Sequence, residues 1–284
     1  HSGVMAPSGI LLAPGWSHNP TVAAALQAKT EGINGNFDCV TYLDISTDPE
    51  EDGAAVYTDV KTAKEALGAT SPHAAALWPM GAVGDKIYYL SAMFAAMTAY
   101  IDAGNSDVPY ESPSNKDLKI TATVLKDGTE ILLDQQQAND LLNANGVITA
   151  INANGYKAWG NNTAAYPSTT DPKDRWLAVR RFFDWDGNNF ILTYFQKADK
   201  PGNTRLIQSI VDSQNIIGNG YVARDYCAGY RTEFKSDENP ITNLLDGHLT
   251  THTYLAPYIP AEYIENIREY DTKALEAALT GGGE

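Results

Sequence analysis

Cysteine is scarce in this chain of 284 residues, which contains only Cys39 and Cys227. The two are far apart in the sequence, and neither forms part of a Cys-x-x-Cys pair. The pattern therefore signals neither a disulfide framework nor a zinc site with cysteine ligands. It is typical of a protein in a reducing compartment.

Basic residues and long apolar runs are scarce as well. The chain has 20 Lys and Arg against 35 Asp and Glu, a formal net charge of −15, which opposes nucleic acid because basic side chains must hold the phosphates. The segment Ile87 to Ile101 has only 15 uncharged residues, whereas a membrane span needs about 20. We expect no nucleic-acid partner and no membrane insertion, and we interpret this segment as a buried helix.

Apolar residues make up 43% of the chain, enough for a core in one large or two ordinary domains. In the first half, short apolar runs alternate with helical patterns. The expected strands are Gly9–Gly15, Phe37–Ile45, Ala74–Pro79 and Val147–Ile151, and the expected helices are Thr21–Lys29, Thr58–Leu67, Tyr88–Ala103 and Asp134–Asn143. This alternation is typical of a largely parallel sheet covered on both faces.

The densest apolar segment, Asp174 to Asn215, predicts a helix pair. Apolar residues recur at three- and four-residue steps from Trp176 to Phe195 and again from Leu206 to Ile217, and Asp199–Asn203, which contains Pro and Gly, separates them. Segments rich in Thr, Tyr and Ile follow. They predict strands at Gly229–Phe234, Leu249–Tyr258 and Glu262–Asp271.

The predicted fold class is α/β (α+β overall), with a mixed, largely parallel sheet flanked by helices, followed by the helix pair and C-terminal strands. The polar run Tyr166–Asp174 is the best domain boundary. We therefore expect one domain over residues 1–170, a second over 171–279 and a flexible tail over 280–284.

Three acidic or histidine-containing patterns resemble metal sites, and each lacks a required ligand. Position 249 is leucine between His248 and His252, where a zincin carries glutamate. The loop Asp48–Asp59 has proline at its second place, and Asp184–Asn189 lacks the terminal glutamate of a calcium loop. We interpret His248 and His252, near Asp246, as polar residues on one strand face. We interpret Asp48–Asp59 as a solvated acidic loop and Asp184–Asn189 as surface or kink residues. No metal and no cofactor is expected.

The sequence contains no nucleotide or hydrolase motif. Gly218-Asn-Gly220 lacks the third glycine of a dinucleotide fingerprint, and neither GxxxxGK[ST] nor GxSxG occurs. The loop Trp159–Thr163 has the polar density of a ligand loop, but turns contain the same residues. An α/β enzyme that binds a small acidic or sugar-like ligand near this loop remains an alternative, supported by fold class alone. No catalytic residue is predicted.

Seven stretches, in order, resemble the tail sheath proteins of contractile phages and phage-tail-like particles. They are Ile10–Gly15, Ala76–Pro79, Pro109–Asn115, Leu141–Val147, Tyr156–Thr163, Val179–Arg181 and Asp199–Pro201. The resemblance implies a subtilisin-like sheath domain followed by a sheath C-terminal domain. The term subtilisin-like describes a similarity of fold only, because no Asp/His/Ser catalytic set can be identified in this sequence. Such proteins usually have an extended arm and a β-rich domain before the first stretch, and because the chain begins at His1, we expect the natural protein to begin further upstream.

The resemblance implies a structural subunit and not an enzyme. Subunits would form a helical tube around an inner tail tube and contract to drive it through the host envelope. Implied partners are other copies of the chain, the inner tail tube protein, and baseplate and tail terminator proteins. The implied location is the virion tail, assembled in the bacterial host cytoplasm, and the sheath of a bacteriocin or secretion machine is the alternative.

The segment Leu249 to Asp271 is predicted to pair with a sheet of a neighbouring subunit. Thr, Tyr and Ile favour extended pairing, and Pro257 and Pro260 limit the segment to edge or linking positions. The candidate inter-subunit residues are Leu249, Thr251, Thr253, Leu255, Ile264, Ile267 and Tyr270.

Overall fold

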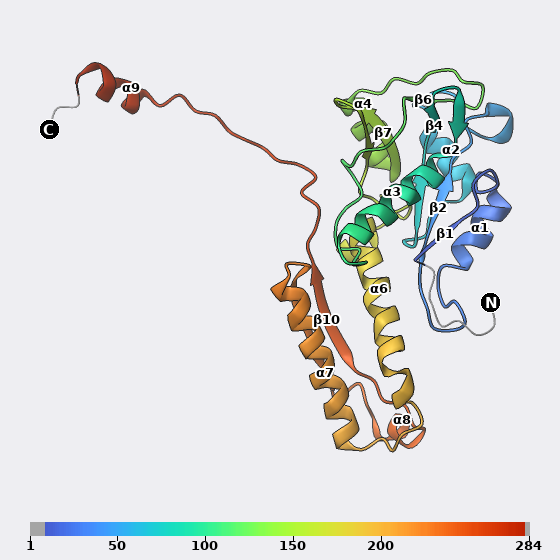
Figure 1. Ribbon diagram of the computed structural model, residues 1–284, viewed down its shortest axis with the longest axis vertical. Helices are drawn as coiled ribbons and strands as arrows, with labels where there is room; N and C mark the ends of the chain where they lie inside the picture. The colour runs from blue at the N-terminus through green and yellow to red at the C-terminus, as the bar shows by residue number, and fades with distance from the viewer. Residues whose placement is uncertain (1–8, 282–284) are drawn as a thin grey trace.

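A five-stranded sheet forms the centre of the computed structural model, which describes residues 9–281 (Figure 1). Its spatial order is β1 (Ile10–Leu12), β2 (Val40–Asp44), β3 (Ala74–Leu77), β7 (Val147–Asn152) and β8 (Tyr156–Trp159). The first four strands are parallel, and β8 pairs antiparallel with β7. The mixed, largely parallel sheet predicted from the sequence is confirmed.

Helices cover both faces of this sheet, as predicted. Because side chains alternate along a strand, Ala74 and Ala76 of β3 lie in the core beneath α1 (Pro20–Ala28) and α2 (Val60–Leu67), while Ala75 and Leu77 face α3 (Leu90–Gly104). The Asn19 side chain accepts from the backbone N–H of Thr21 and so caps α1. Within residues 9–281 no helix combines the length and hydropathy needed to cross a membrane.

A three-stranded sheet, β5-β4-β6, was not predicted from the sequence. Its strands are β4 (Met80–Val83), β5 (Lys86–Tyr88) and β6 (Ala122–Val124), too short to show a period of two. The expected helix at Asp134–Asn143 is present in irregular form. It consists of α4 (Gln135–Gln137), a π turn (Ala138–Leu142) and a 3₁₀ turn (Asn143–Asn145), and another 3₁₀ turn (Pro49–Glu51) lies in the acidic loop.

The helix pair is confirmed as α6 (Leu177–Tyr194) and α7 (Thr204–Ala223), preceded by the short α5 (Pro172–Arg175) and interrupted after the 3₁₀ turn Phe195–Lys197. The antiparallel hairpin β9 (Cys227–Glu233) and β10 (His252–Pro257) packs against both helices, and β10 runs between them in Figure 1. α8 (Ile241–Leu245) lies in the connection. An aromatic cluster holds this unit together: Phe182, Trp185, Tyr221 and Tyr230.

The predicted strand Glu262–Asp271 is wrong for the isolated chain. Residues 258–271 have no regular secondary structure and lead to a helix that sequence analysis missed, α9 (Thr272–Leu279). The composition favours extended backbone, but a strand also needs a partner, and none of the described residues pairs with this stretch. We call residues 258–279 the C-terminal arm; it reaches away from the rest of the chain in Figure 1. Of the predicted tail 280–284, residues 282–284 lie outside the described part.

Candidate functional site

Polar residues of α6 join the central sheet to the hairpin, which corrects the expectation that Asp184–Asn189 are surface or kink residues. The helix runs through them without interruption, and Asp184, Asp186 and Asn188 are all buried. The Asn188 amide accepts from the backbone N–H of Asp38 (3.0 Å) and donates to its carbonyl (2.7 Å). Asp184 and Asn188, four residues apart, therefore fix one side of α6 to the α/β part of the chain.

Asp184 lies in a buried charge cluster at the start of β3. Its carboxylate accepts from Arg180 Nε at 2.9 Å and lies 3.1 Å from Nδ1 of His73, which is also 3.2 Å from the Cys39 carbonyl. Burial lowers the pKa of His73, but the Asp184 carboxylate outweighs it, so this pKa is higher than usual. Through its contact with Asp184, the His73 imidazole links the start of β3 to α6.

Asp186 points to the other side, toward the hairpin. The Tyr230 hydroxyl donates to its carboxylate (3.0 and 3.2 Å to the two oxygens), and the Gln214 amide of α7 donates to that hydroxyl. Burial raises the pKa of Asp186 from 3.8 to about 6, and the single hydroxyl donor offsets this only in part. Sequence analysis missed this residue because its helix face looked like a solvent face.

A groove lies between α6 and β10. It has a volume of about 220 Å³ and is lined by Phe183, Asp186, Gly187, Phe190, Thr251, Thr253 and Leu255. Thr253 and Leu255 are two residues apart in β10 and so lie on one face of the strand, and Thr251 lies just before it. α7 packs against β9, whereas α6 contacts β10 and leaves this groove beside it.

The outer edge of β10 carries backbone groups that face away from the hairpin. The Asn215 side chain bonds both the N–H (2.8 Å) and the C=O (2.9 Å) of Thr232, which is paired with Thr253. Thr232 and Thr253 therefore form a non-hydrogen-bonded pair, and the N–H and C=O of Thr253 point to the outer edge of the strand. No strand within residues 9–281 pairs with that edge.

The other candidate inter-subunit residues lie on either side of β10. Leu249 lies just before the strand and is 36% exposed, whereas Ile264 and Ile267 are both 85% exposed and Tyr270 is 71% exposed. The structure thus brings Thr251, Thr253 and Leu255 together and leaves the three residues of the C-terminal arm apart from them. Their pairing with another subunit stays a prediction.

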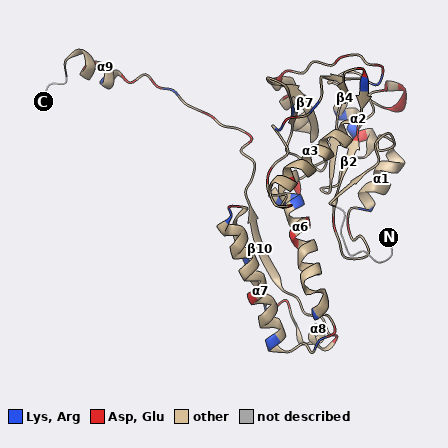
Figure 2. Cartoon of the chain, viewed as in Figure 1, with Lys and Arg blue, Asp and Glu red and all other residues tan. Residues whose placement is uncertain are grey.

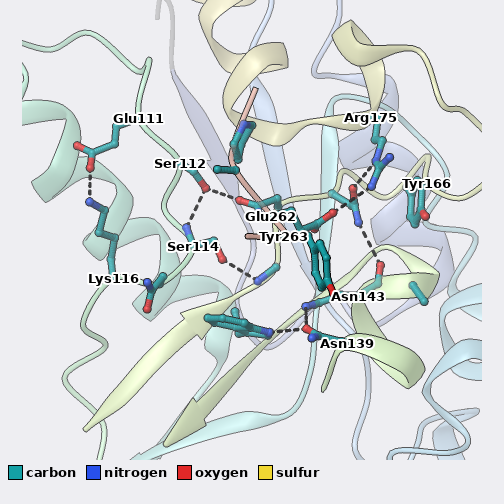
Figure 3. Close-up of a pocket in the computed structure, with 18 residues that line it drawn as sticks. Glu111, Ser112, Ser114, Lys116, Asn139, Asn143, Tyr166, Arg175, Glu262 and Tyr263 are labelled. Atoms are coloured by element: carbon teal, nitrogen blue, oxygen red, sulfur yellow. Dashed lines mark hydrogen bonds and ion pairs between the residues drawn. The ribbon is translucent and has the colours of Figure 1, made fainter. Parts of the chain in front are cut away.

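Residues 159–162 of the loop Trp159–Thr163 line a polar cavity of about 560 Å³ (Figure 3). Trp159 ends β8, which the sequence did not predict as a strand, and its indole N–H donates to Asn139 (2.7 Å). The walls carry amide and hydroxyl groups from Ser112, Ser114, Asn143 and Asn161, and residues 260–263 of the C-terminal arm close one side. The cavity is therefore formed by the body and the arm together.

The metal candidates are not brought together as ligand sets. His252 bonds Glu238 (2.7 Å) at the start of β10, and the acidic loop that follows β2 in the sequence includes the red segment at the right of Figure 2. Among residues 9–281 no group of three or more His, Cys, Asp and Glu side chains could hold a metal ion. Both cysteines are free and buried, and burial raises the pKa of Cys39 to about 12, so its thiol is protonated.

No family model matches the sequence. Among curated proteins, the tail sheath protein of Burkholderia phage BcepMu is 27% identical over 261 residues, which cover 88% of this chain and 53% of that protein. The major tail sheath protein of Serratia phage KSP20 is 23% identical over 238 residues, covering 82% of this chain and 58% of that protein. The chain thus spans little more than half the length of these relatives.

Solved structures share the fold at low sequence identity. The contracted sheath complex of PVC, an extracellular contractile injection system, has a TM-score of 0.74 at 19% identity and covers 95% of this chain and 72% of that one. A chain of the baseplate structure of the anti-feeding prophage has a TM-score of 0.74 at 18% identity, covering 93% of this chain and 68% of that one. These names agree with the family resemblance predicted from the sequence.

Proposed function

We propose that this chain, a relative of contractile tail sheath proteins by sequence and by fold, is part of a structural sheath subunit that assembles as a helical tube around an inner tail tube. The single observation that carries this proposal is the similarity to two sheath proteins over more than four fifths of the chain. Contraction of the tube would drive the inner tube through the host envelope.

A contractile helical sheath of this kind fits a phage tail as well as a bacteriocin or a secretion machine. The curated relatives come from phages, and the structural neighbours come from injection systems. We propose the virion tail as the location, with assembly in the bacterial host cytoplasm. The proposed partners are further copies of the chain, the inner tail tube protein, and baseplate and tail terminator proteins. No catalytic role is proposed, in keeping with the structural roles for which the relatives are named.

The proposed link between subunits is the C-terminal arm of one copy laid along the outer edge of β10 in another. Support comes from the groove of about 220 Å³ beside that edge and from the outward backbone groups of Thr253. Four or five backbone hydrogen bonds at about 0.5–1.5 kcal/mol each would supply several kcal/mol per link. Because such contacts are heterologous and need not close into a ring, they suit an open helical polymer.

We also propose the domain boundary near residue 171 and the two units 1–170 and 171–279. The two units are not independent, because α6 contributes to both of them. Leu177 packs with the central sheet, whereas Phe182 packs with the hairpin, so the helix belongs to the cores of both units. A rigid connection of this kind would transmit a rotation of one unit to the other.

Electron microscopy of the full-length protein tests the function, with striated hollow tubes as the expected result. Deletion of residues 258–279 from that protein tests the arm. Tubes should disappear while circular dichroism stays close to that of the parent, because the sheet, the helices and the hairpin keep their own contacts. Tubes of normal length after the deletion would contradict the linking role, and loss of the fold would instead make the arm part of its own subunit's core.

A further inference from the structure

Arg175 is held in a fixed position at the junction of the two units. Its guanidinium carbon lies 4.5 Å from the centroid of the Tyr166 ring and 4.1 Å from that of the Trp176 ring. Its Nε donates to the Asn162 amide oxygen at 3.0 Å, and the buried Asn162 in turn donates to the carbonyl of Asn143 at 3.1 Å. A planar guanidinium stacked in this way loses little side-chain freedom when it binds a carboxylate.

A terminal nitrogen of Arg175 reaches the C-terminal arm. Its terminal nitrogen donates to Glu262 Oε2 at 3.1 Å, and residues 260–263 close one side of the cavity in Figure 3. The two side chains are 24% and 38% exposed, so solvent screens the pair in part. Every residue of the arm except Pro260 is exposed, and Glu262 is the arm residue that bonds Arg175. Glu262 is thus placed where the arm leaves its own subunit.

We propose that the Arg175–Glu262 ion pair is a latch that holds the root of the C-terminal arm against its own subunit and must open before the arm passes to a neighbour. The second half of this statement rests on the proposed function. While the pair is closed, the root of the arm is fixed against its own subunit, so association that needs the root to move is slowed. The ion pair holds the arm at one defined position, because one carboxylate binds one fixed guanidinium. The apolar residues of the arm do not supply such a specific contact.

Pulsed electron paramagnetic resonance with spin labels at Ser168→Cys and Ile264→Cys measures the latch directly. Both positions are exposed, and the native Cys39 and Cys227 are buried. Glu262→Gln should lower the ratio of closed to open arm about two- to fivefold, the range of a partly exposed ion pair. Glu265→Gln, three residues along the exposed arm, is the matched control and should leave the distance distribution unchanged. High salt should reproduce the effect of Glu262→Gln in the parent and add little to that variant.

An unchanged distance distribution in Glu262→Gln would overturn the latch, and because Glu262 is on the surface, loss of the fold cannot mimic this result. Partial recovery of the closed population by the charge exchange Arg175→Glu with Glu262→Arg would support it. In the full-length protein, Glu262→Gln should shorten the lag before tubes form. A changed distance distribution with an unchanged lag before tube formation would refute the role of the latch in assembly. Absence of tubes from the parent and from all variants would count against the proposed function. In that case the distance measurement would still decide whether the latch exists.

Discussion

Substitution of the buried carboxylate Asp186 by asparagine should stabilise the protein at neutral pH. The pKa of Asp186 rises from 3.8 to about 6 on folding, which corresponds to about 3 kcal/mol of unfavourable free energy when the carboxylate is ionised in the fold. Asparagine has nearly the same shape and no charge, and its carbonyl can still accept from the Tyr230 hydroxyl. We expect a gain of up to about 3 kcal/mol at pH 7.5, or roughly 6–12 °C in melting temperature.

The stabilisation by Asp186→Asn should depend on pH. Because the pKa of Asp186 is higher in the folded than in the unfolded chain, the contribution of this group to stability is fully present below pH 3.8 and is lost as the pH rises through about 6. The advantage of Asp186→Asn should therefore vanish below pH 4 and reach its full value above pH 7.

Denaturant unfolding at several pH values, followed by tryptophan fluorescence, provides the assay. Trp185 is a suitable reporter, since its ring lies 5.6 Å from that of Phe182 and 5.4 Å from that of Tyr221 in the same cluster. Asp246→Asn is the matched control, because Asp246 is an exposed carboxylate in the same unit, and it should change stability by less than about 0.5 kcal/mol. Equal stability of Asp186→Asn and the parent at pH 7.5, or an advantage that persists at pH 4, would refute the reasoning.

Four other predictions follow from the packing and charges. His73→Gln should destabilise the chain most below pH 6.5 and progressively less as the pH rises through the raised pKa of His73; an equal loss at pH 9 in denaturant unfolding would contradict this. Gly218→Ala should cost about 1–3 kcal/mol, because the new Cβ would lie 2.0 Å from the Tyr230 ring, whereas Gly220→Ala, with no atom within 4 Å, should be neutral or stabilising in the same melting experiment. Light scattering of this chain should show a monomer or weak oligomer at micromolar concentration, since its charge of −15 keeps copies apart; spontaneous long tubes would exclude this. Calorimetric titration with calcium and zinc should give no stoichiometric binding at micromolar affinity, and such binding would revive His248, His252 or the loop Asp48–Asp59 as ligands.

Long periodic segments were predictable because their pattern is local. The strands and helices of the central sheet follow from short apolar runs that alternate with helical periods, and α6 and α7 follow from their apolar stripes. The three-residue strands β5 and β6 are too short to show any period. The strands β9 and β10 were expected from their Thr- and Tyr-rich runs, but neither their pairing with each other nor the open outer edge of β10 was expected.

The buried polar residues of α6 could not be predicted from a single apolar face. α6 contacts the sheet on one side and the hairpin on another, so Asp184 and Asp186 are both buried although neither lies on the apolar stripe. The four-residue steps Arg180, Asp184 and Asn188 were the available signal, since they predict one polar face that needs a polar partner. The ion pair between Arg175 and Glu262 joins residues 87 positions apart, and no local pattern indicates it.

Disulfide cross-linking between two full-length versions of different mass tests the proposed subunit link most directly. One version carries Thr251→Cys beside the outer edge of β10, and the other carries cysteine at Ile264, Ile267 or Tyr270 of the arm. If the arm of one subunit lies along β10 of another, assembled tubes should yield a cross-linked species of mixed mass for at least one arm position, and a control cysteine at the exposed Thr58 should yield none. Tubes that form normally without a mixed cross-link at any of the three positions would contradict the account.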